Sequence, residues 1–188
     1  MNTRHLLPLL SISLLPSLAL AHEGDHSHLG LLSGLLHPFT GIDHLLAMLA
    51  IGIWAALQTR TLKLAIPASF LGALLLGFLM GVAGLNLPMV ETGIGLSVLL
   101  LGVLIATSAL KLPTLACLSL AAGFALFHGY AHGAEATGSL WAFAVGFLGS
   151  SLVLHLGGGL LAAGIRQIPQ LTRALGVTIA TSGAVMLF

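Results

Sequence analysis

The chain has 188 residues, of which only six are Lys or Arg and five are Asp or Glu. A soluble chain of this length would carry about 47 charged residues, so a soluble globular domain is excluded, and 57% hydrophobic residues exclude a disordered chain. Six basic residues are too few for a nucleic-acid binder, and one cysteine allows neither an intrachain disulfide nor a Cys-based zinc site. The composition indicates an integral membrane protein that is unusual in having nine histidines.

Residues 1–21 have the pattern of a secretory signal peptide. A basic residue near the start is followed by an apolar run over 6–20 and by a small-x-small cleavage site that ends at Ala21. A first transmembrane helix is the alternative, but the run is shorter than the roughly 20 residues of a span, and two prolines weaken it as a helix. We therefore expect cleavage after Ala21, so that the mature chain begins at His22.

Six apolar stretches follow the signal, and each is long enough to cross a bilayer as a helix. They cover residues 39–57, 64–83, 89–110, 115–131, 140–163 and 171–188. The fold class predicted is an all-α, polytopic membrane protein with six transmembrane helices in a compact bundle. The chain then divides into the signal peptide (1–21), a His-rich N-terminal segment outside the membrane (22–36) and the six-helix membrane domain (37–188).

The basic residues predict the orientation of this bundle in the membrane. All those of the mature chain lie in or just beyond the loops that follow spans one, three and five: Arg60, Lys63, Lys111, Arg166 and Arg173. The positive-inside rule places these loops in the cytoplasm. We therefore expect a multi-pass protein of the bacterial inner membrane, with its mature N-terminus on the periplasmic side.

A first polar cluster opens the first span. His37, Asp43 and His44 lie within eight residues of each other, and Pro38 suits the first position of a helix. A single histidine here would more simply be a helix-packing residue. An ionisable carboxylate inside a membrane is costly unless it is paired or coordinated, so the three residues together favour a metal site.

A second cluster closes the fourth span. His128, His132 and Glu135 are spaced i, i+4 and i+7, which puts them on one stripe of a helix. A polar cap at the membrane interface is the alternative interpretation. Because the first span runs inward and the fourth runs outward, both clusters are predicted at the same depth, near the outer face. Imidazole and carboxylate ligands suit Ni²⁺, Co²⁺, Zn²⁺ or Fe²⁺, whereas the lack of thiolate argues against Cu⁺.

Three further histidines stand at the mature N-terminus, and one lies deep in the fifth span. His22, His26 and His28 would form a flexible tail that captures metal, with a solvated polar tail as the alternative. His155 is either a second station on an ion path or a packed histidine that bonds a neighbouring helix.

These motifs resemble those of the HupE/UreJ family of nickel permeases. The pattern His-x5-Asp-His is complete from His37 to His44, and Phe-His-Gly-x-Ala-His-Gly-x-Glu is complete from Phe127 to Glu135. The signal, the His-rich start and the six spans are also similar, so the resemblance covers the whole chain. It implies supply of nickel, or in some members cobalt, to hydrogenase or urease. It assigns the metal to the six residues of the two clusters.

The function predicted is therefore a secondary permease for a divalent metal ion, nickel first, with no organic cofactor and no catalytic residues. The lipid bilayer and the ion are its expected partners; nucleic acid is not, and the sequence assigns no oligomeric state. A P-loop pattern is absent, so the chain does not supply ATP drive. An intramembrane zinc hydrolase is one alternative, although its His-Glu-x-x-His motif is missing. A non-transporting metal sensor or an accessory protein for metalloenzyme maturation is the other.

Overall fold

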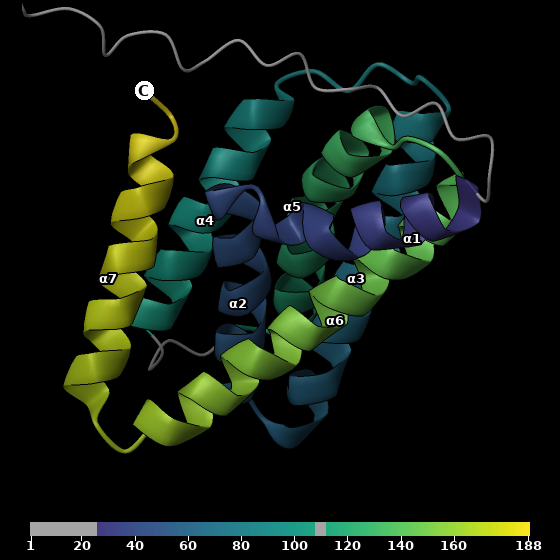
Figure 1. Cartoon of the computed structure of the whole chain (residues 1–188). Coiled ribbons are helices and arrows are strands. Elements are labelled where there is room, and N and C mark those ends of the chain that lie inside the picture. Colours follow the sequence, from purple (N-terminus) through teal and green to yellow (C-terminus); the bar gives the residue numbers. More distant parts are fainter. Residues whose placement is uncertain (1–25, 108–111) are drawn as a thin grey trace, which may run out of the picture.

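The computed structural model describes residues 26–107 and 112–188, in which the regular elements are all helices joined by short loops, with no strand among them (Figure 1). The all-α prediction is confirmed for this part of the chain. The predicted signal peptide and His22 lie outside the described residues. The elements are α1 (His26–Leu36), a 3-10 turn η1 (His37–Phe39), α2 (Ile42–Ala56), α3 (Arg60–Val82), α4 (Val90–Ala106), α5 (Thr114–Glu135), α6 (Leu140–Ile165) and α7 (Pro169–Val185).

Each of the six predicted apolar stretches corresponds to one helix from α2 to α7. By length and composition α3, α5 and α6 are able to cross a membrane. The segments Gly30–Phe39 and Ile42–Ala56 pass the same test together, but they are bent by 79° at the break between them, which gives up to four candidate spans. The α4 helix is apolar but has only 17 residues.

The described part of the His-rich segment, residues 26–36, differs from the flexible tail that the sequence predicts. From His26 onward it is a helix, α1, which packs along α6. Small residues make the approach close: a Cβ at Gly146 would lie 2.8 Å from the Leu35 backbone nitrogen. The segment becomes ordered because its apolar residues find this neighbouring helix, a tertiary contact that local composition does not reveal.

The helices pack mainly in pairs, α3 with α5, α4 with α7, and α2 with α6. Figure 1 shows α7 alongside α4 at one edge, with α6 running diagonally across α2. Gly129 on α5 faces the backbone of α3, where a Cβ would overlap the Leu74 carbonyl and lie 2.9 Å from the Phe78 nitrogen. Such small-residue contacts let membrane helices approach closely, and here they fix the position of the end of α5.

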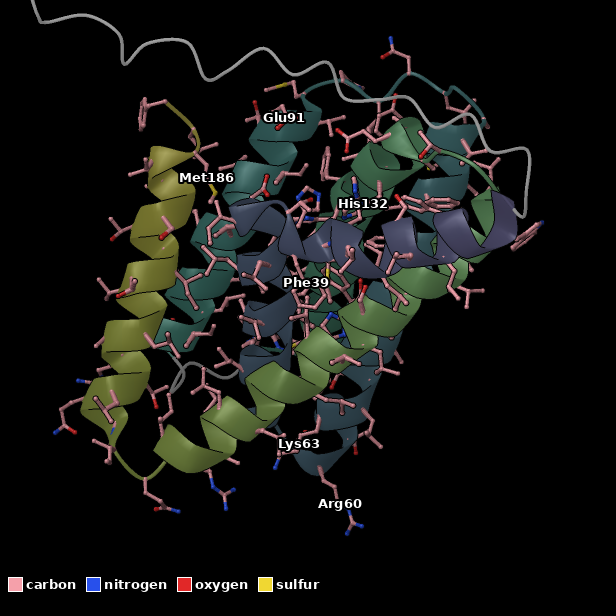
Figure 2. The ribbon with its side chains drawn as sticks, in the orientation of Figure 1. Phe39, Arg60, Lys63, Glu91, His132 and Met186 are labelled. Carbon is pink, nitrogen blue, oxygen red and sulfur yellow. The ribbon has the colours of Figure 1, made fainter. Side chains whose placement is uncertain are left out.

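The two ends of the molecule differ in charge, while its sides are apolar. Arg60 and Lys63 lie at one end, and Glu91 lies at the opposite end (Figure 2). Large apolar side chains such as Leu64, Leu115 and Leu160 are exposed on the outer surface. A protein that crosses a bilayer needs an apolar belt in contact with the lipid chains and polar ends in contact with water.

Candidate metal-binding site

The first cluster is positioned by the break between η1 and α2. Pro38 lies at the start of η1, and Gly41, in an extended conformation, precedes α2. Asp43 and His44 therefore fall in the first turn of α2. The backbone N–H of His44 donates to Asp43 Oδ1 at 2.7 Å, and His44 Nδ1 lies 2.8 Å from the same oxygen. Because an ionised carboxylate only accepts, Nδ1 carries the proton, and the lone pair of neutral His44 is left on Nε2.

The second cluster lies on the last two turns of α5. The helix runs to Glu135, four residues beyond the predicted end of its span, and Gly138 with a positive φ of 72° follows it. His128 and His132 are 0% and 2% exposed. Their i, i+4 spacing turns both rings toward α2, as the sequence predicts.

The structure brings the four histidines of the two clusters together. Ring centroids are separated by 4.3 Å between His44 and His132, 4.8 Å between His44 and His128, and 4.6 Å between His37 and His132. Phenylalanine rings surround them: Phe147 lies 4.0 Å from His132, and Phe143 lies 5.3 Å from His37. We call these four imidazoles the histidine cluster. It is enclosed by apolar rings, which strengthens any electrostatic interaction within it.

Carboxylates gather beside the histidine cluster. Glu135 is exposed, and its Oε2 accepts a hydrogen bond from His37 Nε2 at 3.1 Å. Glu91 of α4, to which sequence reasoning gave no role, faces the same space. This cavity, which we call the outer cavity, measures about 220 Å³. Its lining residues are His37, Thr40, Gly41, Asp43, His44, Glu91, Ala131, His132 and Glu135.

Ser97 of α4 is a further residue of the site that sequence reasoning missed. Its buried hydroxyl donates to the Ile94 carbonyl at 2.7 Å and lies 2.7 Å from His128 Nε2. When the single hydroxyl proton is donated to the Ile94 carbonyl, Ser97 accepts from Nε2–H of His128, and the imidazole lone pair then lies on Nδ1. The only sequence signal was a hydroxyl within an apolar stretch. Ser97 reaches His128 because α4 packs against α2 and α5, and the sequence pattern does not show this packing.

Several ring nitrogens of the histidine cluster are buried without a hydrogen-bond partner. They are His44 Nε2, His128 Nδ1 and both nitrogens of His132. Each such burial costs about 1–3 kcal/mol, so these atoms are available to a ligand. The rings meet edge to face, with interplanar angles of 64–88°. Accordingly, no group of three or more His, Cys, Asp or Glu side chains in the described residues is already arranged to hold a metal ion. Metal binding at the histidine cluster would require the imidazoles to rotate.

Two of the remaining predicted histidines begin α1, and His155 lies apart from the histidine cluster. His26 and His28 begin α1, and metal capture by the N-terminal segment stays a prediction. His155 lies on α6, 3% exposed, with Phe70 between it and His128. It lines a separate cavity of about 700 Å³.

Comparisons with known proteins agree with these motifs. The model of the HupE / UreJ protein family matches residues 10–186. Protein HupE of Rhizobium leguminosarum bv. viciae is 39% identical over 181 residues, which cover 92% of this chain and 92% of that protein. No solved structure matches the chain significantly.

Proposed function

Because this chain belongs to the HupE/UreJ family of nickel and cobalt uptake proteins, we propose that it imports a divalent metal ion, nickel first, through a site between α2 and α5. The family consists of membrane transporters and not of enzymes, so the alternative of an intramembrane zinc hydrolase is wrong. Cobalt, zinc and iron remain alternative ions.

One observation carries the proposal: four imidazoles, of which His128 and His132 are buried, lie together beside a cavity lined by carboxylates. Hydrogen bonds set the tautomer of two of them. Nδ1 of His44 bonds the Asp43 carboxylate, and Nε2 of His128 bonds the Ser97 hydroxyl. Both leave a lone pair free for a ligand. Neutral imidazole is a good ligand for Ni²⁺, Co²⁺ and Zn²⁺, and hydrogen-bonded partners that orient ligating histidines are typical of metal sites.

The proposed path begins at the outer cavity. Asp43, Glu91 and Glu135 attract the hydrated cation, and the histidine cluster replaces part of its water. His22, His26 and His28 would raise the metal concentration at this entrance. Release requires that the ligands do not all bind at once. The edge-to-face packing of the rings supports ligation in steps, because the ion gains its ligands only as the imidazoles rotate.

The proposed topology has six spans, α2 to α7, which follow a cleaved signal peptide. Arg60 and Lys63 lie on the cytoplasmic side, and Glu91 lies on the periplasmic side. Helices of 17 residues, such as α4 and α7, are about 26 Å long. This is slightly less than the hydrocarbon thickness of about 30 Å, so the bilayer would thin locally around them.

The membrane potential supplies a sufficient driving force. A divalent ion gains about 4.6 kcal/mol when it crosses 100 mV inward, which supports roughly thousand-fold accumulation. No ATPase motif is needed for this, and the sequence has none.

Radiolabelled Ni²⁺ uptake into proteoliposomes tests the proposal. With an inside-negative potassium diffusion potential, the purified protein should accumulate nickel, and Co²⁺ should compete more strongly than Zn²⁺ or Fe²⁺. A sensor or accessory protein would bind nickel without accumulating it. Nickel binding without potential-dependent flux would overturn the proposal.

A further inference from the structure

The cavity of about 700 Å³ that His155 lines is a groove between α3 and α6. Its floor is the close contact of α2 with α6, where a Cβ at Gly52 would lie 3.0 Å from the Gly159 backbone nitrogen. The α3 helix packs mainly on α5, and α6 packs mainly on α1 and α2. The facing sides of α3 and α6 are therefore left open to each other, and we call this opening the α3–α6 groove.

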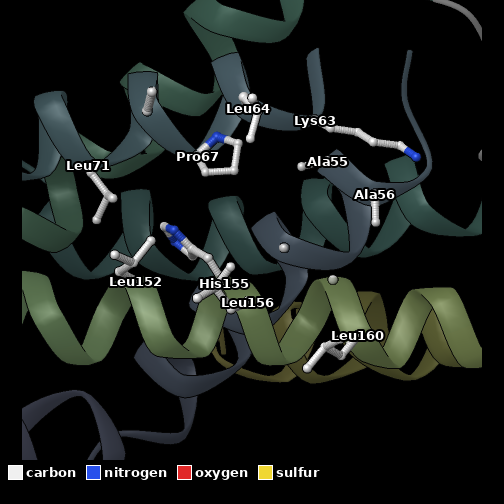
Figure 3. Close-up of a pocket in the computed structure, with 13 residues that line it drawn as sticks. Ala55, Ala56, Lys63, Leu64, Pro67, Leu71, Leu152, His155, Leu156 and Leu160 are labelled. Atoms are coloured by element: carbon white, nitrogen blue, oxygen red, sulfur yellow. The ribbon is translucent and has the colours of Figure 1, made fainter. Parts of the chain in front are cut away.

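Two stripes of apolar side chains form the walls of the α3–α6 groove. Figure 3 shows the stripe of α3 opposite the stripe of α6. Leu64 and Leu160 are 79% and 75% exposed, so the groove opens on the outer surface of the protein. Each stripe recurs at the spacing of one helix face. The stripes consist of Leu64, Pro67 and Leu71 on α3, and of Leu152, Leu156 and Leu160 on α6.

The α3–α6 groove has the depth of one leaflet and the volume of an acyl chain. Both α3 and α6 are long and apolar enough to cross a membrane, so lipid surrounds the groove. From Lys63 to Leu71 the groove follows α3 for eight residues, or about 12 Å, which is slightly less than half of the roughly 30 Å hydrocarbon core. If each methylene takes about the 30 Å³ of a liquid water molecule, a chain of about 16 carbons fills about 480 Å³.

One end of the α3–α6 groove is basic. Among the described residues that line it, Lys63 alone carries a formal charge, and Figure 3 shows its side chain extended at this end. Arg60 lies one turn earlier on α3 and is exposed. The acidic residues of the described chain are at the other end of the molecule, where they line the outer cavity: Asp43, Glu91 and Glu135. The charge that complements Lys63 must therefore come from outside the described residues.

We propose that the α3–α6 groove binds one anionic phospholipid, whose acyl chain lies between the two apolar stripes and whose phosphate pairs with Lys63. A lysine near the end of a membrane helix keeps its methylenes against apolar surface while its ammonium reaches the headgroup level. Basic pockets between membrane helices bind anionic lipid headgroups. A phospholipid matches both parts of the groove, since its hydrocarbon suits the walls and its negative charge suits the end. In the proposed topology it belongs to the cytoplasmic leaflet.

A bound lipid would also join two parts of the bundle. It would contact α3, which packs on α5, and α6, which packs on α1 and α2. A ligand that binds only the folded protein raises its thermal stability. Phosphatidylglycerol added in detergent should therefore raise the unfolding temperature of the unchanged protein. The site is independent of which ion the protein transports.

Native mass spectrometry of the purified protein tests the lipid site. Separate samples contain phosphatidylglycerol or phosphatidylcholine with the same acyl chains, and we expect one phosphatidylglycerol to be retained about fivefold more often than one phosphatidylcholine. Lys63→Gln removes the charge and keeps most of the side chain, so it should abolish this preference. Arg173→Gln is the matched control, because it neutralises an exposed residue of α7 outside the groove, and it should keep the preference. Equal retention of the two lipids by the unchanged protein, or the same preference in both variants, would overturn the site.

A second variant fills the groove and leaves Lys63 in place. Ala68 is exposed and lines the groove, so Ala68→Phe should lower retention of phosphatidylglycerol several-fold and remove the rise in unfolding temperature. Ala163→Phe makes the same change at an exposed position of α6 outside the groove, and it should behave like the unchanged protein. Equal lipid retention by the two phenylalanine variants would place the lipid elsewhere and overturn the site. A dimer that retains no lipid would show that a second copy of the chain covers the groove instead.

Discussion

At the residue scale, the site depends on which nitrogen of each imidazole carries the proton. Asp43 fixes His44 through Nδ1, and Ser97 fixes His128 through Nε2. The two histidines therefore present opposite ring nitrogens, Nε2 and Nδ1, as free lone pairs. A neutral histidine held in the wrong tautomer presents an N–H where a ligand is needed, so these partners matter as much as the histidines themselves.

Ser97→Ala tests this role of the hydroxyl. The substitution frees His128 to change tautomer, so nickel affinity should fall about 10- to 100-fold, as measured by titration of the purified protein. Ser150→Ala is the control, because Ser150 is also buried but donates only to carbonyls of its own helix. Equal nickel affinity in the two variants would contradict the proposed tautomer control.

Glu91→Gln tests the carboxylates of the outer cavity. It removes one negative charge near the entrance and leaves the shape of the side chain almost unchanged. The half-saturating nickel concentration for uptake should rise several-fold, and this increase should shrink at high ionic strength because salt screens exposed charges. An unchanged half-saturating concentration would show that Glu91 takes no part in attracting the ion.

At the element scale, glycines set how closely the helices approach and hence where the histidines lie. Gly129 and Gly123 are both on α5, but only Gly129 faces the backbone of α3; a Cβ at Gly123 would have no neighbour within 4 Å. Gly129→Ala should push α5 away from α3 and displace His128 and His132. We expect it to be destabilised by about 1–3 kcal/mol and to lose nickel uptake.

Gly123→Ala is the matched control for this helix contact. It makes the same chemical change on the same helix in open space, so it should keep both uptake and thermal stability. Thermal unfolding in detergent and uptake into proteoliposomes measure the two effects. Equal behaviour of the two alanine variants would contradict the packing described for α3 and α5.

Much of the helical order was predictable from the sequence, whereas the contribution of α4 to the site was not. Long apolar stretches and breaks indicate helices directly, and helical spacing places His128 and His132 on one face. Glu91 and Ser97 join the site only because α4 packs beside α2 and α5, which no local pattern encodes. The helical state of α1 was missed for the same reason, because its stabilising contact is with α6.

At the scale of the whole molecule, charge is divided between the two ends. Arg60 and Lys63 lie at the end opposite Glu91 (Figure 2). With the proposed six spans and the basic end in the cytoplasm, the outer cavity would open to the periplasm.

Single cysteines in a Cys117→Ser background test this orientation. Thr137 follows α5 and Gln167 follows α6, and both are exposed. In intact spheroplasts, an impermeant thiol reagent should label Thr137→Cys at once and Gln167→Cys only after the membrane is permeabilised. The opposite pattern would invert the topology, and labelling of both from outside would contradict an odd number of crossings between these positions.

The central claim is that the histidine cluster carries the transported ion, and nickel flux through His132→Ala tests it most directly. His132 contacts both His37 and His44, and neither of its ring nitrogens has a hydrogen-bond partner. Its loss should therefore remove ligation without breaking a hydrogen bond. In proteoliposomes with an inside-negative potential, and at protein incorporation equal to that of the unchanged protein, the variant should take up no more radiolabelled nickel than empty liposomes. Uptake equal to that of the unchanged protein would contradict the account.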